Sequence, residues 1–362
     1  MTIRDVGRAL IARLGAFVLT CVAVLVATAS PAAAHGWAPD GTNYRSSVVA
    51  VVDARTGDAV DTGAVTWSVV GGDGLLQVRN TGAVDVVVTG YDEEPYLRVG
   101  PDGVFENRNA PATYLNTDRF ANVTVPSDVA PDDAPDWRRI SNEDRWRWHD
   151  HRIHWMAPTP PPQVRDRPHV TQQVLAWVVP FQVGGRGLEV QGALTYAPPP
   201  VVWPWLLGSA AAMLVPVAIV LTTAGAGPAV RLQVVLTALV AGAGLVVAIG
   251  DVIAAPAGVG TDLWAVTQTV VPLGVVGALA WTVWRPTPSD GVAGPGSTLV
   301  VAAVVIAFTG GVARLTQLTS SQVINALPAP AVRIVVATSL TLWVTAVLLA
   351  VVLSRRSRAV QV

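Results

Sequence analysis

Hydrophobic and polar positions divide the chain into two parts with different patterns. Between residues 35 and 200, short runs rich in Val, Thr and aromatic residues are separated by Gly, Asp, Asn and Pro, which is typical of β-strands. Beyond residue 200 the chain consists mainly of long apolar runs. We therefore expect an all-β domain followed by an α-helical membrane domain.

Eight runs in the first part have the length and composition of strands. They are residues 46–53, 64–70, 74–80, 84–91, 96–99, 145–151, 173–183 and 188–197. Strands at this spacing favour an antiparallel β-sandwich, which we expect to be Ig/cupredoxin-like. The segment 107–144 is rich in Pro, Asp and Asn and predicts a long ordered loop of the kind that tends to shape sites.

The second part contains five apolar runs, each near the ~20 residues that a helix needs to cross a bilayer. They are residues 202–223, 232–254, 263–284, 298–318 and 331–353. We expect a five-helix transmembrane domain over 201–354 in contact with the lipid bilayer, followed by a cytoplasmic tail at 355–362.

The N-terminal residues 1–34 have the three parts of a secretory signal peptide. Three arginines precede an apolar run, and Ala32 and Ala34 satisfy the small-x-small rule for cleavage. Cleavage after Ala34 would make His35 the first residue of an extracytoplasmic domain over 35–200. An uncleaved signal anchor is the alternative.

Loop charges predict the same topology. With the N-terminal domain exported, five spans place Arg231, Arg285 and Arg355 on the cytoplasmic side, as the positive-inside rule requires. We expect a multi-pass protein of the cell membrane with a cytoplasmic C-terminus.

Composition limits the possible partners and ligands. Of the 25 acidic residues, 21 lie within 35–200, and this acidic domain argues against a nucleic-acid partner. The chain has one cysteine, Cys21, within the predicted signal peptide. A metal site in the mature protein would therefore use imidazole, carboxylate, thioether or main-chain ligands.

The segment Trp148–Met156 holds three of the five histidines. On a strand, His149 and His151 would share one face, and such a pair can hold a metal ion at the ~2 Å distances that Zn or Cu requires. His154 has the opposite parity and would need a bulge to join them. His35 is the sharper third candidate, because its α-amine and imidazole form a chelate that completes the planar nitrogen set preferred by Cu(II).

Other residues of this region have alternative interpretations. The histidines could instead hydrogen-bond within a structural core rich in Trp and Arg. We expect Met156 to pack beside Trp155; the alternative is a soft thioether ligand suited to Cu(I). We expect Asp150 to accept an imidazole N–H or to pair with an arginine, and His169 to be solvated in a loop.

A signal cut just before His35 and the later His-x-His at His149 and His151 resemble the copper site of the B subunit of particulate methane monooxygenase. The pattern is similar in outline to the N-terminal-histidine sites of the CopC copper proteins and of lytic polysaccharide monooxygenases. The motif WHDHRIHWM at Trp148–Met156 also resembles that of a group of uncharacterised actinobacterial membrane proteins. The resemblance implies copper ligation by His35, His149 and His151, but it does not extend to His154, and monooxygenase activity does not carry over.

These observations lead to three functional hypotheses. The first is a membrane-anchored, extracytoplasmic copper-binding protein for copper acquisition, delivery or resistance, with a copper-handling protein as a possible partner. The second is a copper-dependent oxidase or monooxygenase component, and the third is a metal-free interaction or sensory protein.

In the membrane domain, Asp251 and Arg314 are the conspicuous ionisable residues. We expect them near the outer interface, where they either meet water or form a functional relay.

Overall fold

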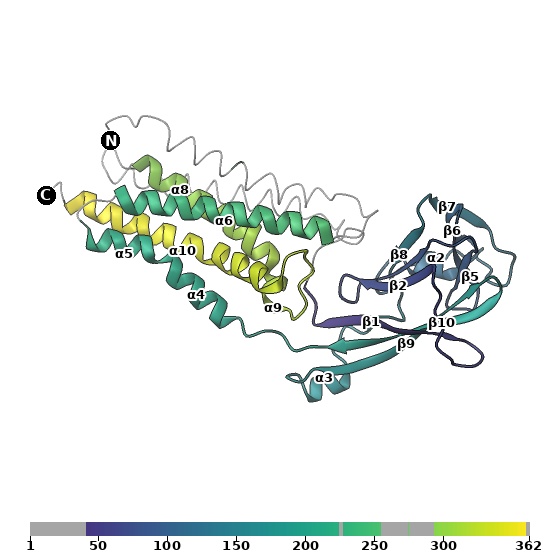
Figure 1. Ribbon diagram of the computed structural model, residues 1–362. Coiled ribbons are helices and arrows are strands. Elements are labelled where there is room, and N and C mark those ends of the chain that lie inside the picture. Colours follow the sequence, from purple (N-terminus) through teal and green to yellow (C-terminus); the bar gives the residue numbers. More distant parts are fainter. Residues whose placement is uncertain (1–40, 224–226, 255–273, 275–292, 360–362) are drawn as a thin grey trace. The chain divides into compact units, whose positions relative to one another are not determined.

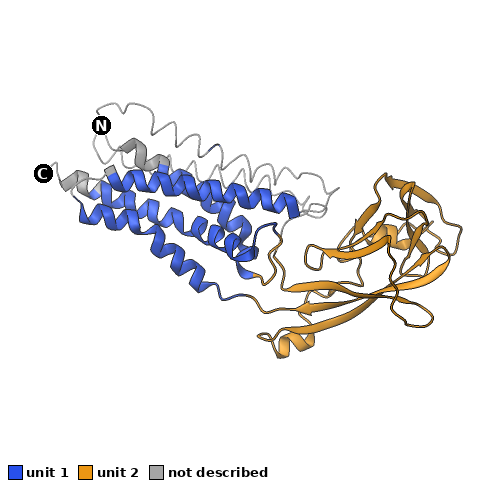
Figure 2. Cartoon of the chain, in the orientation of Figure 1, with its two compact units in different colours: residues 1–40, 200–319, 325–362 blue, residues 41–199, 320–324 orange. Residues whose placement is uncertain are grey.

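The computed structural model describes residues 41–223, 227–254, 274 and 293–359. It divides into two compact units (Figure 2). One unit is built from strands and comprises residues 41–199 and 320–324; the described part of the other, within 200–319 and 325–362, is helical. The predicted signal peptide, His35 and the predicted span 263–284 lie outside the described residues.

The β unit contains ten strands in two antiparallel sheets (Figure 1). Seven strands pair in the order β1-β10-β9-β4-β5-β6-β7, and three pair in the order β2-β3-β8. The strands are β1 (Tyr44–Asp53), β2 (Val65–Val70), β3 (Leu75–Asn80), β4 (Val86–Thr89), β5 (Pro95–Gly100), β6 (Gly103–Asn107), β7 (Trp137–Ser141), β8 (Arg145–Trp148), β9 (Gln172–Val183) and β10 (Arg186–Tyr196). The prediction of a large antiparallel β domain is confirmed.

Both sheets contribute side chains to one apolar core. Leu76 and Val78 of β3 are fully buried, as is Leu97 of β5, and they belong to the same cluster as Phe181 of β9. Burying an aliphatic or aromatic side chain of this size stabilises a fold by about 1.5–3 kcal/mol. Trp148, the last residue of β8, is part of this core, so the histidine segment starts from a rigid position.

The segment 107–144 is more structured than expected. It contains the short helix α2 (Pro111–Leu115) and strand β7, whereas a second short helix, α3 (Pro162–Asp166), precedes β9. The β unit also includes residues 320–324, where Gln322 forms an antiparallel bridge with Thr42.

The helices of the second unit account for four of the five predicted spans. They are α4 (Trp203–Met213), α5 (Val215–Thr222), α6 (Gly227–Ala254), α8 (Ala293–Ile306), the π-helix η2 (Ala307–Gly311), the 3₁₀-helix η3 (Val312–Arg314), α9 (Leu315–Thr319) and α10 (Ala329–Ala359). Four stretches of the described residues are long and apolar enough to cross a membrane: Trp203–Thr222, Pro228–Ala254, Leu299–Thr319 and Ala329–Leu353.

Two local features distinguish these helices from the predicted spans. The first span is divided at Leu214, because Pro216 has no N–H to continue the hydrogen-bond ladder of α4 into α5. The last helix continues to Ala359, through residues predicted to form the tail.

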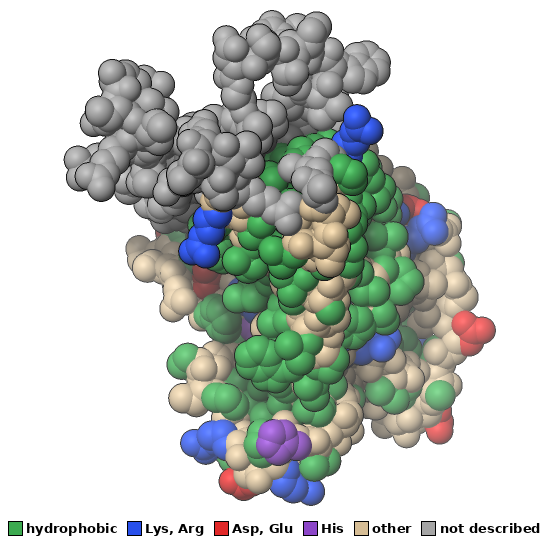
Figure 3. Space-filling view, turned by 90° about the vertical axis from the view of Figure 1, so that its left-hand side faces the viewer, with side chains coloured by type: hydrophobic (Ala, Val, Ile, Leu, Met, Phe, Trp, Pro, Cys, Tyr) green, Lys and Arg blue, Asp and Glu red, His purple; other side chains and the backbone are tan. Residues whose placement is uncertain are grey.

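The surface of the helical unit is apolar. Hydrophobic side chains make up most of its visible surface in Figure 3, and Leu207, Leu221, Leu239 and Ile253 are each more than 60% exposed. Water-soluble proteins rarely expose apolar patches of this extent, whereas lipid-facing helices require them. These helices indicate a multi-pass membrane protein.

Candidate functional site

The histidine segment follows strand β8 but is not part of it. Strand β8 pairs with β3 only as far as Trp148, which lies opposite Leu76. From His149 onward the chain turns, because the carboxylate of Asp150 accepts a hydrogen bond from the backbone N–H of Arg152 (3.1 Å). The predicted strand over 145–151 is therefore three residues too long, and strand parity does not decide which histidines can meet.

Asp150, which is buried, and Arg152, which is partly exposed, form an ion pair that holds this turn. Two nitrogens of Arg152 donate to the carboxylate at 2.8 and 2.7 Å, and Trp148 Nε1 donates to it at 2.9 Å. Asp150 is fully buried. Burial disfavours its charge, but the Arg152 guanidinium and these hydrogen bonds outweigh that effect and lower the pKa of Asp150. Two roles were predicted for Asp150, and the structure shows the one in which it pairs with an arginine.

Each of the three imidazoles has one ring nitrogen next to a backbone carbonyl. His149 Nδ1 lies 2.8 Å from the oxygen of Gly74, and His151 Nε2 lies 2.9 Å from that of Asp118. His154 Nδ1 has a longer contact, 3.3 Å, with the oxygen of Trp155. A carbonyl oxygen can only accept, so these nitrogens carry the protons. In a neutral imidazole, the opposite nitrogen is the one with a lone pair: Nε2 of His149, Nδ1 of His151 or Nε2 of His154.

Tyr91 holds the backbone and ring of His151 in place. Its hydroxyl accepts the backbone N–H of His151 (3.0 Å) and donates to the side-chain oxygen of Asn116. Its ring is stacked on the His151 imidazole, with centroids 5.5 Å apart and planes only 7° from parallel. The orientation of His151 is thus fixed by a stacked ring and a carbonyl acceptor.

His154 is the most deeply buried of the three histidines, with 1% of its surface exposed. Its Nε2 atom is buried and has no hydrogen-bond partner. Burial, followed by the positive charge of Arg119, lowers the pKa of His154 to about 4, and burial also lowers the pKa of His149. Both rings are therefore neutral at pH 7 and available as ligands. A buried polar atom without a partner is unfavourable by about 1–3 kcal/mol, which suggests that Nε2 of His154 serves a ligand.

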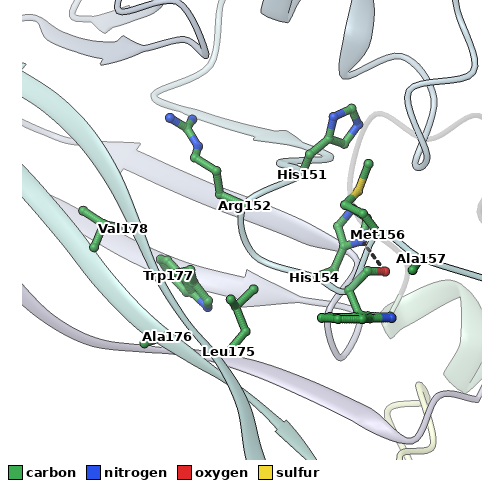
Figure 4. Close-up of a pocket in the computed structure, with 10 residues that line it drawn as sticks. His151, Arg152, His154, Met156, Ala157, Leu175, Ala176, Trp177 and Val178 are labelled. Atoms are coloured by element: carbon green, nitrogen blue, oxygen red, sulfur yellow. Dashed lines mark hydrogen bonds between the residues drawn. The ribbon is translucent and has the colours of Figure 1, made fainter. Parts of the chain in front are cut away.

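His151 and His154 lie side by side at a pocket. Their ring centroids are 5.9 Å apart and their planes are nearly perpendicular. The pocket has a volume of about 500 Å³ and is drawn in Figure 4. Ten residues line it: His151, Arg152, His154, Trp155, Met156 and Ala157 from the histidine segment, and Leu175, Ala176, Trp177 and Val178 from β9. The lining includes two imidazoles and a thioether, and it has no carboxylate.

The structure describes three of the four predicted metal ligands, His149, His151 and His154. It brings His151 and His154 together, whereas His149 does not line the pocket and His35 lies outside the described residues. No three His, Cys, Asp or Glu side chains among the described residues are grouped closely enough to hold a metal ion. The ligand set of His35, His149, His151 and His154 remains a prediction. His169 is exposed, as expected.

Sequence reasoning missed the residues that support these histidines. Gly74 and Asp118 contribute only their carbonyl oxygens, which no side-chain pattern can indicate. No sequence pattern connects Tyr91 with the histidines. Its role depends on the fold, which brings residue 91 next to residue 151.

The helical unit contains a buried Asp–Arg pair. Asp251 of α6 accepts a hydrogen bond from Arg314 Nε (3.0 Å), and both residues are less than 10% exposed. Gln317 and Asn325 also donate to the Asp251 carboxylate, and Arg314 donates to the carbonyl of Thr309 (2.7 Å). Of the expected alternatives, contact with water is therefore wrong, because the two charges satisfy each other inside the unit.

Comparison of the chain with protein-family models, with curated proteins and with solved structures found no match.

Proposed function

We propose that the chain is a membrane-anchored, extracytoplasmic copper-binding protein that serves copper acquisition, delivery or resistance. The observation that carries the proposal is the arrangement of the imidazoles in Trp148–Met156. Each has one nitrogen at a carbonyl and a lone pair on the other, and one of these lone pairs, on His154, is buried without a partner.

This arrangement supports metal binding for a physical reason. Histidines that bind metals usually donate their second ring N–H to a carbonyl or carboxylate, which fixes the ring and its tautomer. His151 also has its ring stacked on Tyr91, so its orientation is set in advance. Few buried polar atoms in native proteins lack a partner, and Nε2 of His154 is one of those among the described residues.

The proposal includes His35 as a further ligand. If signal peptidase cuts after Ala34, the α-amine and imidazole of His35 provide two nitrogens. Together with histidines of the segment they would form a nitrogen-rich site of the kind that Cu(II) favours. Such a site would be similar in outline to the N-terminal-histidine copper sites noted above.

The finer architecture belongs to the same proposal. We infer that the two sheets form an Ig/cupredoxin-like sandwich outside the membrane. Residues 263–284 would form a fifth span, which puts the C-terminus in the cytoplasm. Support comes from the shared core of the two sheets and from the arginine distribution of the loops. A copper-handling protein would then reach the site from the extracytoplasmic side.

Titration of the purified full-length protein with Cu(II) tests the proposal. Mature protein that begins at His35 is compared with a variant that carries one extra residue in front of it. We expect tight binding by the first and at least tenfold weaker binding by the second, because the extra residue removes the amine–imidazole chelate.

The other outcomes of this titration distinguish the alternatives. Equal affinity in both proteins would contradict the role of the His35 amine. Absence of binding in both would leave the metal-free interaction or sensory protein. Oxygen consumption by the copper-loaded protein in the presence of a reductant would favour a copper-dependent oxidase or monooxygenase component.

A further inference from the structure

The geometry points to a Cu(I) site made of His151, His154 and the thioether of Met156, and we propose that the pocket selects monovalent copper. This inference rests on the proposed function and deepens it, because it names the oxidation state that the site takes. It also adds a ligand, Met156, that lies outside the predicted set of histidines.

The spacing of the two rings fits a shared ion. With metal–nitrogen bonds of about 2 Å, an imidazole centroid lies roughly 3.2 Å from the metal, so two rings on one ion have centroids at most roughly 6.3 Å apart. The centroids of His151 and His154 are 5.9 Å apart. The spacing of the two rings is therefore compatible with one shared ion.

The third ligand is a sulfur and not a carboxylate. Met156 lines the same pocket as His151 and His154, and Figure 4 draws the three side chains around it. No Asp or Glu lines the pocket. Thioether sulfur is a soft ligand that selects Cu(I), whereas Zn(II) and Cu(II) favour sites with additional nitrogen or oxygen donors.

Charges near the pocket also favour a monovalent ion. Arg119 acts on His154 through its positive charge, and its own partner, Asp73, lies 2.8 Å away and is largely buried. Arg152 lines the pocket but is paired with Asp150. Coulomb repulsion is proportional to the charge of the bound ion, so any residual repulsion from these arginines is twice as large for a divalent ion.

The remaining walls of the pocket are apolar. They include Leu175, Trp177 and Val178 of β9. Such walls provide a bound ion with no further donor atoms. Cu(I) is satisfied by three soft or borderline ligands, whereas Cu(II) would need further ligands that this lining does not provide.

The test uses the full-length protein in lipid nanodiscs, without oxygen and with a reductant. Cu(I) affinity is measured by competition with bicinchoninate for wild type, Met156→Leu and His154→Gln. Matched controls are Met213→Leu, which alters a methionine in α4 of the helical unit, and His169→Gln, which alters an exposed histidine.

We expect about one Cu(I) per chain in wild type and both controls. Met156→Leu should weaken Cu(I) binding at least tenfold while Cu(II) affinity changes less than twofold, and His154→Gln should weaken Cu(I) binding at least as much. Unchanged Cu(I) affinity in Met156→Leu would overturn the inference and leave the proposed function standing. If wild type binds neither Cu(I) nor Cu(II), the proposed function itself fails.

A second measurement covers the case in which Met156→Leu loses both ions because it misfolds. X-ray absorption of the Cu(I)-loaded wild type should show one sulfur neighbour, and Met213→Leu should retain it. The whole sequence has only three methionines and one cysteine, so few other sources of sulfur exist. A first coordination shell without sulfur would overturn the inference.

Discussion

Each unit of the protein contains an Asp–Arg pair with a buried carboxylate, and the two pairs have different surroundings. Asp150 and Arg152 are two residues apart and hold a turn, whereas Asp251 and Arg314 are 63 residues apart and join α6 to η3. Beside the first pair, the Nε2 atom of His154 is buried without a partner. Around the second, amide side chains and a carbonyl complete the hydrogen bonds of both charges.

The difference separates two kinds of buried polar group. A charge pair whose hydrogen bonds are completed by its neighbours is explained by the fold, because a buried charge is tolerated only when it is paired. A neutral imidazole with an unpaired buried nitrogen is not explained in this way. The fold therefore explains both pairs, and the contrast supports the proposal that the histidines beside the first pair bind a ligand.

The largest expected effect is on the turn of the histidine segment. Asp150→Asn leaves the Arg152 guanidinium without its counter-charge, so we expect the β unit to lose about 3–5 kcal/mol of unfolding free energy. Urea denaturation followed by tryptophan fluorescence measures this loss. Asp144→Asn is the control, because the Asp144–Arg79 pair is exposed and should contribute less than about 1 kcal/mol. Equal losses in the two variants would contradict the account.

The loss of stability caused by Asp150→Asn should depend on pH in a defined direction. Because the pKa of Asp150 is lowered in the folded protein, its contribution is complete above the unfolded-state pKa of about 3.9 and is lost as the pH falls through the folded-state pKa. The stability difference between wild type and Asp150→Asn should therefore be constant near neutral pH and shrink only in strong acid. A difference that shrinks between pH ~5 and pH ~7 would be inconsistent with this assignment.

The Asp251–Arg314 pair in the helical unit should also be energetically coupled, and breaking it should lower stability somewhat less than Asp150→Asn does. Asp251→Asn and Arg314→Gln each leave one buried charge without its partner, and we expect each to lower stability by about 2–3 kcal/mol. The double variant should lose less than the sum of the two single losses, because it leaves no unpaired charge. Thermal unfolding in detergent measures the cycle. Additive losses would show that the two residues are not coupled.

His154→Leu should raise the stability of the metal-free protein, whereas the variants above lower it. It removes the unpaired Nε2 atom and loses the long 3.3 Å contact of Nδ1. Leu keeps an apolar side chain against Phe120 and His151, so we expect a gain of about 1 kcal/mol together with loss of copper binding. Urea denaturation in the presence of a chelator measures the gain. A clear loss of stability would favour the interpretation that His154 is purely structural.

The smallest effect concerns the support of His151. Tyr91→Phe keeps the stacked ring but loses the hydroxyl that contacts the His151 backbone and Asn116, which should lower stability by about 0.5–1.5 kcal/mol. Copper affinity should fall only slightly, because no proposed ligand is removed. A loss of affinity as large as that of His154→Gln would mean that Tyr91 positions the site more strongly than proposed.

The sequence predicted most of the fold because the strong patterns survive in the structure. Eight expected strands are present, and four expected spans are helical. The two missed strands are β6 and β7. Strand β7 lies at the edge of its sheet and carries two arginines, and short, charged strands of this kind have weak hydrophobic alternation.

The candidate site was only partly predictable. The density of histidines identifies the cluster, but the predicted strand over 145–151 is too long, because the turn at Asp150 interrupts a sequence with the composition of a strand. The proximity of Tyr91 to His151 and the carbonyl contacts depend on tertiary pairing, which a single sequence does not reveal.

The most direct test of copper binding at the histidine segment is the copper content of the purified full-length protein. Wild type, the His151→Gln/His154→Gln double variant and the His169→Gln control are equilibrated with copper, desalted and analysed for metal per chain. We predict about one tightly bound copper in wild type and in His169→Gln and almost none in the double variant. Equal copper in all three proteins, or none in wild type, would contradict the account.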